Sequence, residues 1–108
     1  MNLHRLFVGL LVFAMCSLAH AADIAAGAAK AKEVCAACHG LDGNSPQADY
    51  PKLGGQYPDF LAKAMRDYKS GQRKNAVMAG FAAGLSRQEI DNLAAYYAAQ
   101  PRVIGTKW

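Results

Sequence analysis

Several features that mark common protein classes are missing from this 108-residue chain. No basic run is interleaved with aromatic residues, which argues against a nucleic-acid partner. The longest apolar run, residues 6–18, has 13 members, against about 20 for a bilayer-spanning helix, so stable membrane insertion is not expected. Charged residues make up 19% and hydrophobic residues 53%, a balance that excludes a disordered chain. Repeats, linkers and paired strand-like segments are also missing, and the length allows one domain.

The amino-terminal segment has the pattern of a secretory signal peptide. A short basic stretch ending at Arg5 precedes the apolar run, and Ala19 and Ala21 supply the small side chains that a signal peptidase requires. We therefore expect cleavage after Ala21, a signal peptide of residues 1–21, a mature domain of residues 22–108 and a periplasmic location.

Two other interpretations of this segment are weaker. An uncleaved membrane anchor would need a longer apolar run. A lipoprotein would be acylated at Cys16, but the bulky Phe13 and Met15 before it make a poor acylation signal. The net charge is +4 and becomes +3 when Arg5 is removed, a mild excess that at most favours an acidic partner.

The strongest motif is Cys35-Ala36-Ala37-Cys38-His39. Two cysteines three apart and followed by histidine are the pattern of covalent c-type haem attachment, with His39 as the proximal iron ligand. A zinc site, a thioredoxin-like redox pair or a disulfide could also use these thiols. A mature chain has no other cysteine or histidine, so a zinc site would lack an obvious fourth ligand and haem is favoured.

Three helices are predicted, and the fold is expected to be all-α. Alanine-rich residues 24–34 follow the N-cap Asp23 and lead into the cysteine motif, with Gly27, Ala31 and Val34 on one small-residue face. The second helix starts at Pro58 and stops near residues 70–71. It has an apolar face of Phe60, Leu61, Ala64, Met65 and Tyr68.

The third helix opens with the capping box of Ser86 and Glu89 and ends before Pro101. Its buried stripe is expected to contain Ile90, Leu93, Ala94 and Tyr97, with Tyr96 on the flank. The tail of residues 102–108 is indeterminate, although Ile104 and Trp108 could cover an edge of the core.

Two loops, residues 40–56 and 72–84, separate the helices. The first is rich in glycine and proline, and its length is unusual in a small domain unless it wraps a bound group. The second holds Met78 among Gly80, Gly84 and small residues, and the Met78 thioether is the favoured sixth ligand of the iron. Met65 is a weaker candidate because it shares a helix face with core residues.

Ligation by His39 and Met78 would raise the reduction potential relative to two nitrogen ligands. With both axial positions filled, the iron changes charge without binding a substrate, so electron transfer is expected and enzyme activity is not. The alternative is a haem protein with a labile sixth ligand, acting as a redox subunit of an enzyme, a peroxidatic enzyme or a gas sensor.

The chain resembles the class I cytochromes c, in particular small single-haem bacterial forms and one half of the dihaem periplasmic cytochromes. The resemblance covers roughly residues 23–100. It rests on the haem motif with Gly40, on Pro51-Lys52-Leu53-Gly54-Gly55-Gln56, on Ser70-Gly71-Gln72-Arg73, and on Met78 followed by Ala82-Ala83-Gly84-Leu85-Ser86.

This resemblance implies a compact fold of three main helices and two loops around one haem c, attached through thioethers to Cys35 and Cys38. It implies that the Pro51 carbonyl accepts a hydrogen bond from His39, that Gly27 and Tyr96 meet where the first and last helices cross, and that Arg73 contacts a haem propionate. Redox proteins that dock transiently are the implied partners. With one attachment motif, the chain would act alone, as a homodimer or as a subunit.

Overall fold

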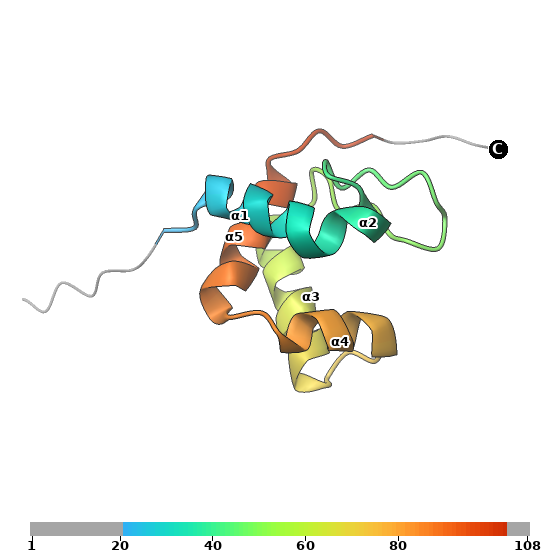
Figure 1. Cartoon of the computed structure of the whole chain (residues 1–108), viewed down its shortest axis with the longest axis vertical. Helices are drawn as coiled ribbons and strands as arrows, with labels where there is room; N and C mark the ends of the chain where they lie inside the picture. The colour runs from blue at the N-terminus through green and yellow to red at the C-terminus, as the bar shows by residue number, and fades with distance from the viewer. Residues whose placement is uncertain (1–20, 104–108) are drawn as a thin grey trace, which may run out of the picture.

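The computed structural model describes residues 21–103, and this part of the chain is helical without strands. Figure 1 shows α1, a π-helical turn and α2 running as one rod, with α3 between α2 and α4. The elements are α1 Ile24–Lys30, the π-turn Ala31–Cys35, α2 Ala36–His39, α3 Pro58–Ser70, α4 Ala76–Ala83 and α5 Arg87–Ala98. The all-α prediction is therefore confirmed.

The first and last helices cross at Gly27. A Cβ placed on this buried glycine would lie 2.1 Å from the Asn92 backbone oxygen and 2.9 Å from Cβ of Tyr96. Ala31, one turn later, is fully buried. The small face of α1 therefore lets two helix backbones approach closely, as the family resemblance implies, and this contact fixes the rod against α5.

Helix α5 provides most of the core. The capping box is present, because the Ser86 hydroxyl accepts from the Glu89 N–H at 3.1 Å and the Glu89 carboxylate accepts from the Ser86 N–H at 2.9 Å. All of the predicted stripe is buried, and so is Tyr96: Ile90, Leu93, Ala94, Tyr96 and Tyr97.

Helix α3 has the predicted bounds, from Pro58 to the residue before Gly71, whose φ of +84° ends the helix in a left-handed conformation. Leu61 is buried, but Phe60 is 51% exposed. The apolar face of α3 is therefore only partly core. Its other part lines a cavity described below.

The prediction of a loop over residues 72–84 is wrong, because Ala76–Ala83 form helix α4. The Asn75 side chain caps this helix by accepting from the Met78 N–H at 2.9 Å. Gly80 suggested a loop, but alanine-rich neighbours outweigh the propensity cost of one exposed glycine. The prediction of three main helices therefore omitted α4. Met78, expected in a loop, lies on this helix.

Residues 40–57 form an irregular segment without helix or strand, as predicted. Signal-peptide cleavage, Cys16 and the packing of Ile104 and Trp108 concern positions at or beyond the edges of the described residues. Within residues 21–103, no helix combines the length and apolar character needed to cross a bilayer.

Candidate haem site

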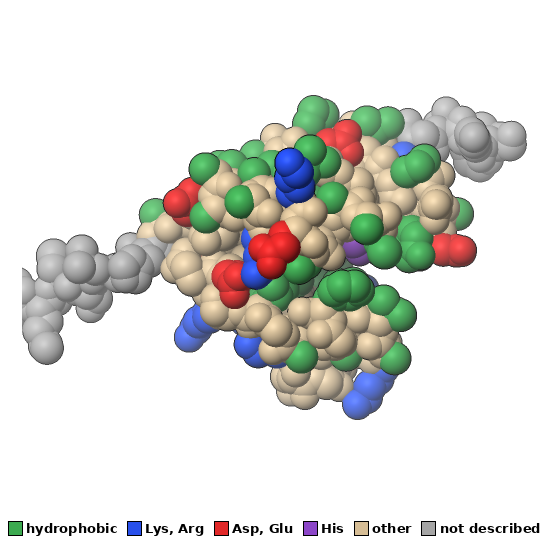
Figure 2. Space-filling view, in the orientation of Figure 1, with side chains coloured by type: hydrophobic (Ala, Val, Ile, Leu, Met, Phe, Trp, Pro, Cys, Tyr) green, Lys and Arg blue, Asp and Glu red, His purple; other side chains and the backbone are tan. Residues whose placement is uncertain are grey.

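The molecule is hollowed between α2 and α4. Figure 2 shows a histidine side chain, drawn in purple, inside this hollow and hydrophobic side chains along its rims. Two adjoining cavities, of about 230 and 270 Å³, make up the hollow. Both are lined by Cys35, His39, Pro51, Tyr68 and Met78. The structure therefore brings the haem motif, the predicted second-loop methionine and the predicted proline into one place.

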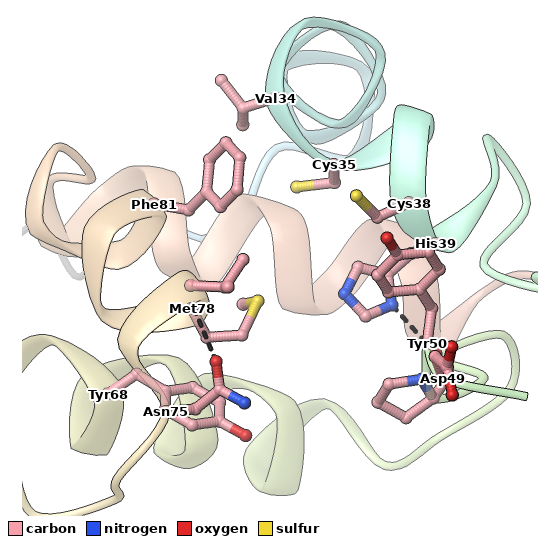
Figure 3. A pocket seen from close by; sticks show the side chains of 12 residues that line it. Val34, Cys35, Cys38, His39, Asp49, Tyr50, Tyr68, Asn75, Met78 and Phe81 are labelled. Atoms are coloured by element: carbon pink, nitrogen blue, oxygen red, sulfur yellow. Dashed lines mark hydrogen bonds between the residues drawn. The ribbon is translucent and has the colours of Figure 1, made fainter.

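The two thiols enter the hollow from the rod. Cys35 ends the π-turn and Cys38 lies in α2, and Figure 3 shows both sulfur atoms beside the cavity. Neither is in a disulfide, and both are half-buried. Burial raises the pKa of the Cys35 thiol. The disulfide interpretation has no support in this geometry.

His39 is held in one orientation. Its side chain is buried, and Nδ1 lies 2.9 Å from the Pro51 carbonyl oxygen, which can only accept, so Nδ1 carries the proton. Tyr50 packs edge-on against the ring, with centroids 6.3 Å apart. Nε2 of the neutral ring is then the lone-pair nitrogen, suited to bind a metal. The predicted contact between His39 and Pro51 is confirmed.

Met78 projects from α4 into the hollow. In Figure 3 its sulfur and the His39 ring approach the same space from opposite walls. Met65 lines only the second cavity and packs against the core cluster. Met78 thus lines both cavities and Met65 only the second, and Met78 reaches the site from a helix and not from a loop. Ligation of the iron by Met78 stays a prediction.

Arg73 lies at the rim of the second cavity. Its guanidinium stacks over the Tyr68 ring, 5.1 Å from the centroid, and Lys52 lines the same cavity. Two exposed cations thus border a mainly apolar space. The contact of Arg73 with a propionate stays a prediction.

Two tyrosines that tie the motif to α5 were missed as site residues. The Tyr97 hydroxyl donates to the Gly40 carbonyl at 3.2 Å, and the Tyr96 hydroxyl donates to the Leu41 carbonyl. These bonds hold the backbone just after His39. The sequence identified both residues only as helix-packing positions. A buried tyrosine hydroxyl usually has a hydrogen-bond partner, and two adjacent tyrosines in a buried helix were the available signal for such bonds.

A haem attached through this motif fits the described residues. Two unpaired thiols, one imidazole with a free lone pair and one thioether face an apolar hollow. Within residues 21–103, no group of three histidine, cysteine, aspartate or glutamate side chains could hold a metal ion. A zinc site of ordinary composition is therefore not formed there.

Comparison with known proteins gives a consistent result. A family model described as cytochrome c oxidase, cbb3-type, subunit III matches residues 22–96. Cytochrome c4 of Pseudomonas aeruginosa is 48% identical over 105 residues, which cover 95% of this chain and 52% of that protein. Cytochrome c-554(548) of Halomonas halodenitrificans is 43% identical over 83 residues, covering 74% of this chain and 99% of that protein.

The crystal structure of reduced recombinant cytochrome c4 from Pseudomonas stutzeri superposes with a TM-score of 0.73 at 40% identity. The superposition covers 79% of the present chain and 49% of the cytochrome c4 chain. The chain thus spans about half the length of the cytochrome c4 relatives that it matches and nearly all of the smaller c-554(548). It belongs to the class I c-type cytochromes, which carry covalent haem c.

Proposed function

We propose that this protein is an exported one-electron carrier whose single haem is ligated by His39 and Met78. The observation that carries the proposal is the placement of these two side chains on opposite walls of one hollow that also receives both thiols. Haem supplies the one-electron chemistry, with iron alternating between its ferric and ferrous forms.

Each residue has a separate task in this proposal. Cys35 and Cys38 form the two thioether bonds, and their positions on one helical rod fix the distance between them. His39 donates Nδ1–H to the Pro51 carbonyl, which sets the ring orientation and increases the basicity of Nε2. Met78 provides a soft thioether that favours the reduced state.

Filled axial positions leave no site for a substrate, so the protein is proposed to be a carrier and not itself an enzyme. Redox partners would dock transiently at the rims of the hollow, where Val77 is 62% and Phe81 46% exposed. Apolar area next to a redox site suits a small, short-lived interface. The nearby Arg73 and Lys52 favour partners with acidic surfaces.

The proposed location is the periplasm, with residues 1–21 removed as a signal peptide and residues 22–108 forming the cytochrome domain. The amino-terminal pattern supports export. The first described helix, α1, begins at Ile24, directly after the N-cap Asp23, whose carboxylate accepts from the Ala26 N–H at 3.0 Å.

Absorption spectroscopy with carbon monoxide tests the proposal. The purified protein should be red and should retain its pigment in acid–acetone, because the haem is covalently held. The ferric form should show the weak long-wavelength band of methionine ligation, and the ferrous form should bind carbon monoxide slowly. Rapid carbon monoxide binding without that band would favour the labile-ligand alternative and contradict the carrier.

A further inference from the structure

The Asn44 side chain joins two segments that are distant in the sequence. One is the Pro51 loop, residues 43–54, and the other is the C-terminal strap, residues 101–103. Asn44 Nδ2 donates to the Pro101 carbonyl at 2.8 Å, and Asn44 Oδ1 accepts from the Val103 N–H at 3.1 Å. The side-chain amide thus pairs with the strap as the peptide group of a neighbouring strand would.

The two ends of the Pro51 loop meet next to Asn44, at Gly43, Leu53 and Gly54, which we call the neck. The Gly43 carbonyl accepts from the N–H groups of Leu53 at 2.7 Å and Gly54 at 3.1 Å. Between these ends, the loop presents the Pro51 carbonyl to Nδ1 of His39. The segment itself contains no helix or strand, and its neck lies against α5, because a Cβ on Gly43 would lie 2.7 Å from the Tyr97 ring. The position of the neck therefore determines where the Pro51 carbonyl lies.

The strap is packed directly onto this neck. A Cβ on Gly54, which is buried, would lie 2.7 Å from both Asn44 Nδ2 and the Pro101 oxygen. Two further bonds reinforce the contact: Lys52 Nζ donates to the Val103 carbonyl at 3.0 Å, and the Arg102 guanidinium donates to the Gly55 carbonyl at 3.2 Å. The neck and the strap therefore interact through the backbone and through three different side chains.

We propose that Asn44 and the C-terminal strap form a latch that positions the Pro51 carbonyl and, through it, His39. Asn44 is a positioning residue, since it touches the loop and the strap and not the iron ligand. The inference rests on the proposed function, in which His39 binds the iron. Opening the latch weakens the bond from His39 to Pro51, makes the imidazole a poorer electron donor and raises the reduction potential.

The strap side of the latch can be tested without changing the loop. Val103→Pro removes the N–H that donates to Asn44, whereas Val103→Ala keeps it and serves as the matched control. Exchange of the His39 Nδ1–H with solvent, measured by NMR in the reduced holoprotein, should be roughly fivefold faster in Val103→Pro, the change expected for one net hydrogen bond. Val103→Ala should exchange at the rate of the unaltered protein.

The loop side is tested with Asn44→Ala and, as a stability control, Ser86→Ala, which removes the N-cap of α5 far from the latch. Asn44→Ala should speed exchange and raise the potential, and Ser86→Ala should do neither. Equal exchange rates in Val103→Pro and Val103→Ala, or changes in Ser86→Ala as large as those in Asn44→Ala, would overturn the latch. A His39 signal without any haem-induced shift in the unaltered protein would instead overturn the proposed ligation.

Discussion

Gly27 of α1 lies against the backbone of Asn92 in α5 with no room for a side chain. A Cβ at position 27 would meet the Asn92 oxygen at 2.1 Å and its carbonyl carbon at 2.7 Å. The same rod carries both cysteines and His39. The closeness of this crossing therefore determines where the haem motif sits relative to the core.

Gly27→Ala should strongly destabilise the protein. Backbone atoms cannot move aside as a flexible side chain can, so the two helices must separate, at a cost of about 3 kcal/mol in the free energy of unfolding. Gly80→Ala is the matched control, because a Cβ there meets nothing within 4 Å and alanine gains about 0.5–1 kcal/mol in a helix. Denaturant unfolding of both variants measures the difference, and similar stabilities would contradict the packing described.

Met78→Ala should leave the haem attached and lower the reduction potential markedly, because the soft ligand is lost. The ferrous variant should also bind carbon monoxide quickly. Met65→Ala is the control, since Met65 lines only the second cavity and packs on the core. Potentiometric titration of the two variants decides the assignment, and a large drop in Met65→Ala would show that the ligand is wrong.

Cys35→Ala should impair haem attachment, because only one thioether can then form. Cys16→Ala should attach haem normally, since Cys16 lies in the expected signal peptide and outside the described residues. The yield of pigment that survives acid–acetone extraction, relative to total protein, measures the effect. Normal attachment in Cys35→Ala would contradict the two-thioether assignment.

The ion pair between Lys30 and Glu89 predicts a pH dependence of stability. Lys30 Nζ lies 2.8 Å from the Glu89 carboxylate, and this bond, aided by the Ser86 N–H, lowers the pKa of Glu89 from 4.5 to about 2. A carboxyl whose pKa is lower in the folded state stabilises the fold above its unfolded pKa. That contribution disappears as the pH falls from about 5 to about 2.

Glu89→Gln should therefore be less stable than the unaltered protein at neutral pH, and the difference should shrink over that acid range. Glu33→Gln, which removes only the exposed contact at 3.6 Å, should cause a smaller loss. Denaturant unfolding across the range gives both differences. A stability gap for Glu89→Gln that is constant with pH would contradict the role of the ion pair.

The elements that sequence predicted well depend on local chemistry. The capping box of Ser86 and Glu89 and the start of α3 at Pro58 follow from residues that are adjacent or a turn apart. The contact of His39 with Pro51 was also predicted, but only through a family resemblance. Nothing in the local sequence of an irregular loop fixes where one carbonyl will point.

The predicted loop at residues 72–84 was wrong because two weak signals competed there. Gly80 and Gly84 suggested a loop, yet Asn75 caps a helix that the alanines propagate. Phe60 shares the helical period of Leu61 but lines the second cavity and is half exposed. Periodicity identifies an apolar face without saying whether protein or a bound group covers it. The bonds from Asn44 to the strap, across 57 and 59 residues, depend on tertiary structure and leave no mark in sequence spacing.

NMR of the reduced holoprotein decides whether His39 and Met78 together bind the iron. A methionine bound to haem iron places its methyl group above the ring, where the ring current shifts the signal far upfield. We expect one such three-proton signal, present in Met65→Ala and missing in Met78→Ala. An upfield methyl that persists in Met78→Ala, or none in the unaltered protein, would contradict this expectation.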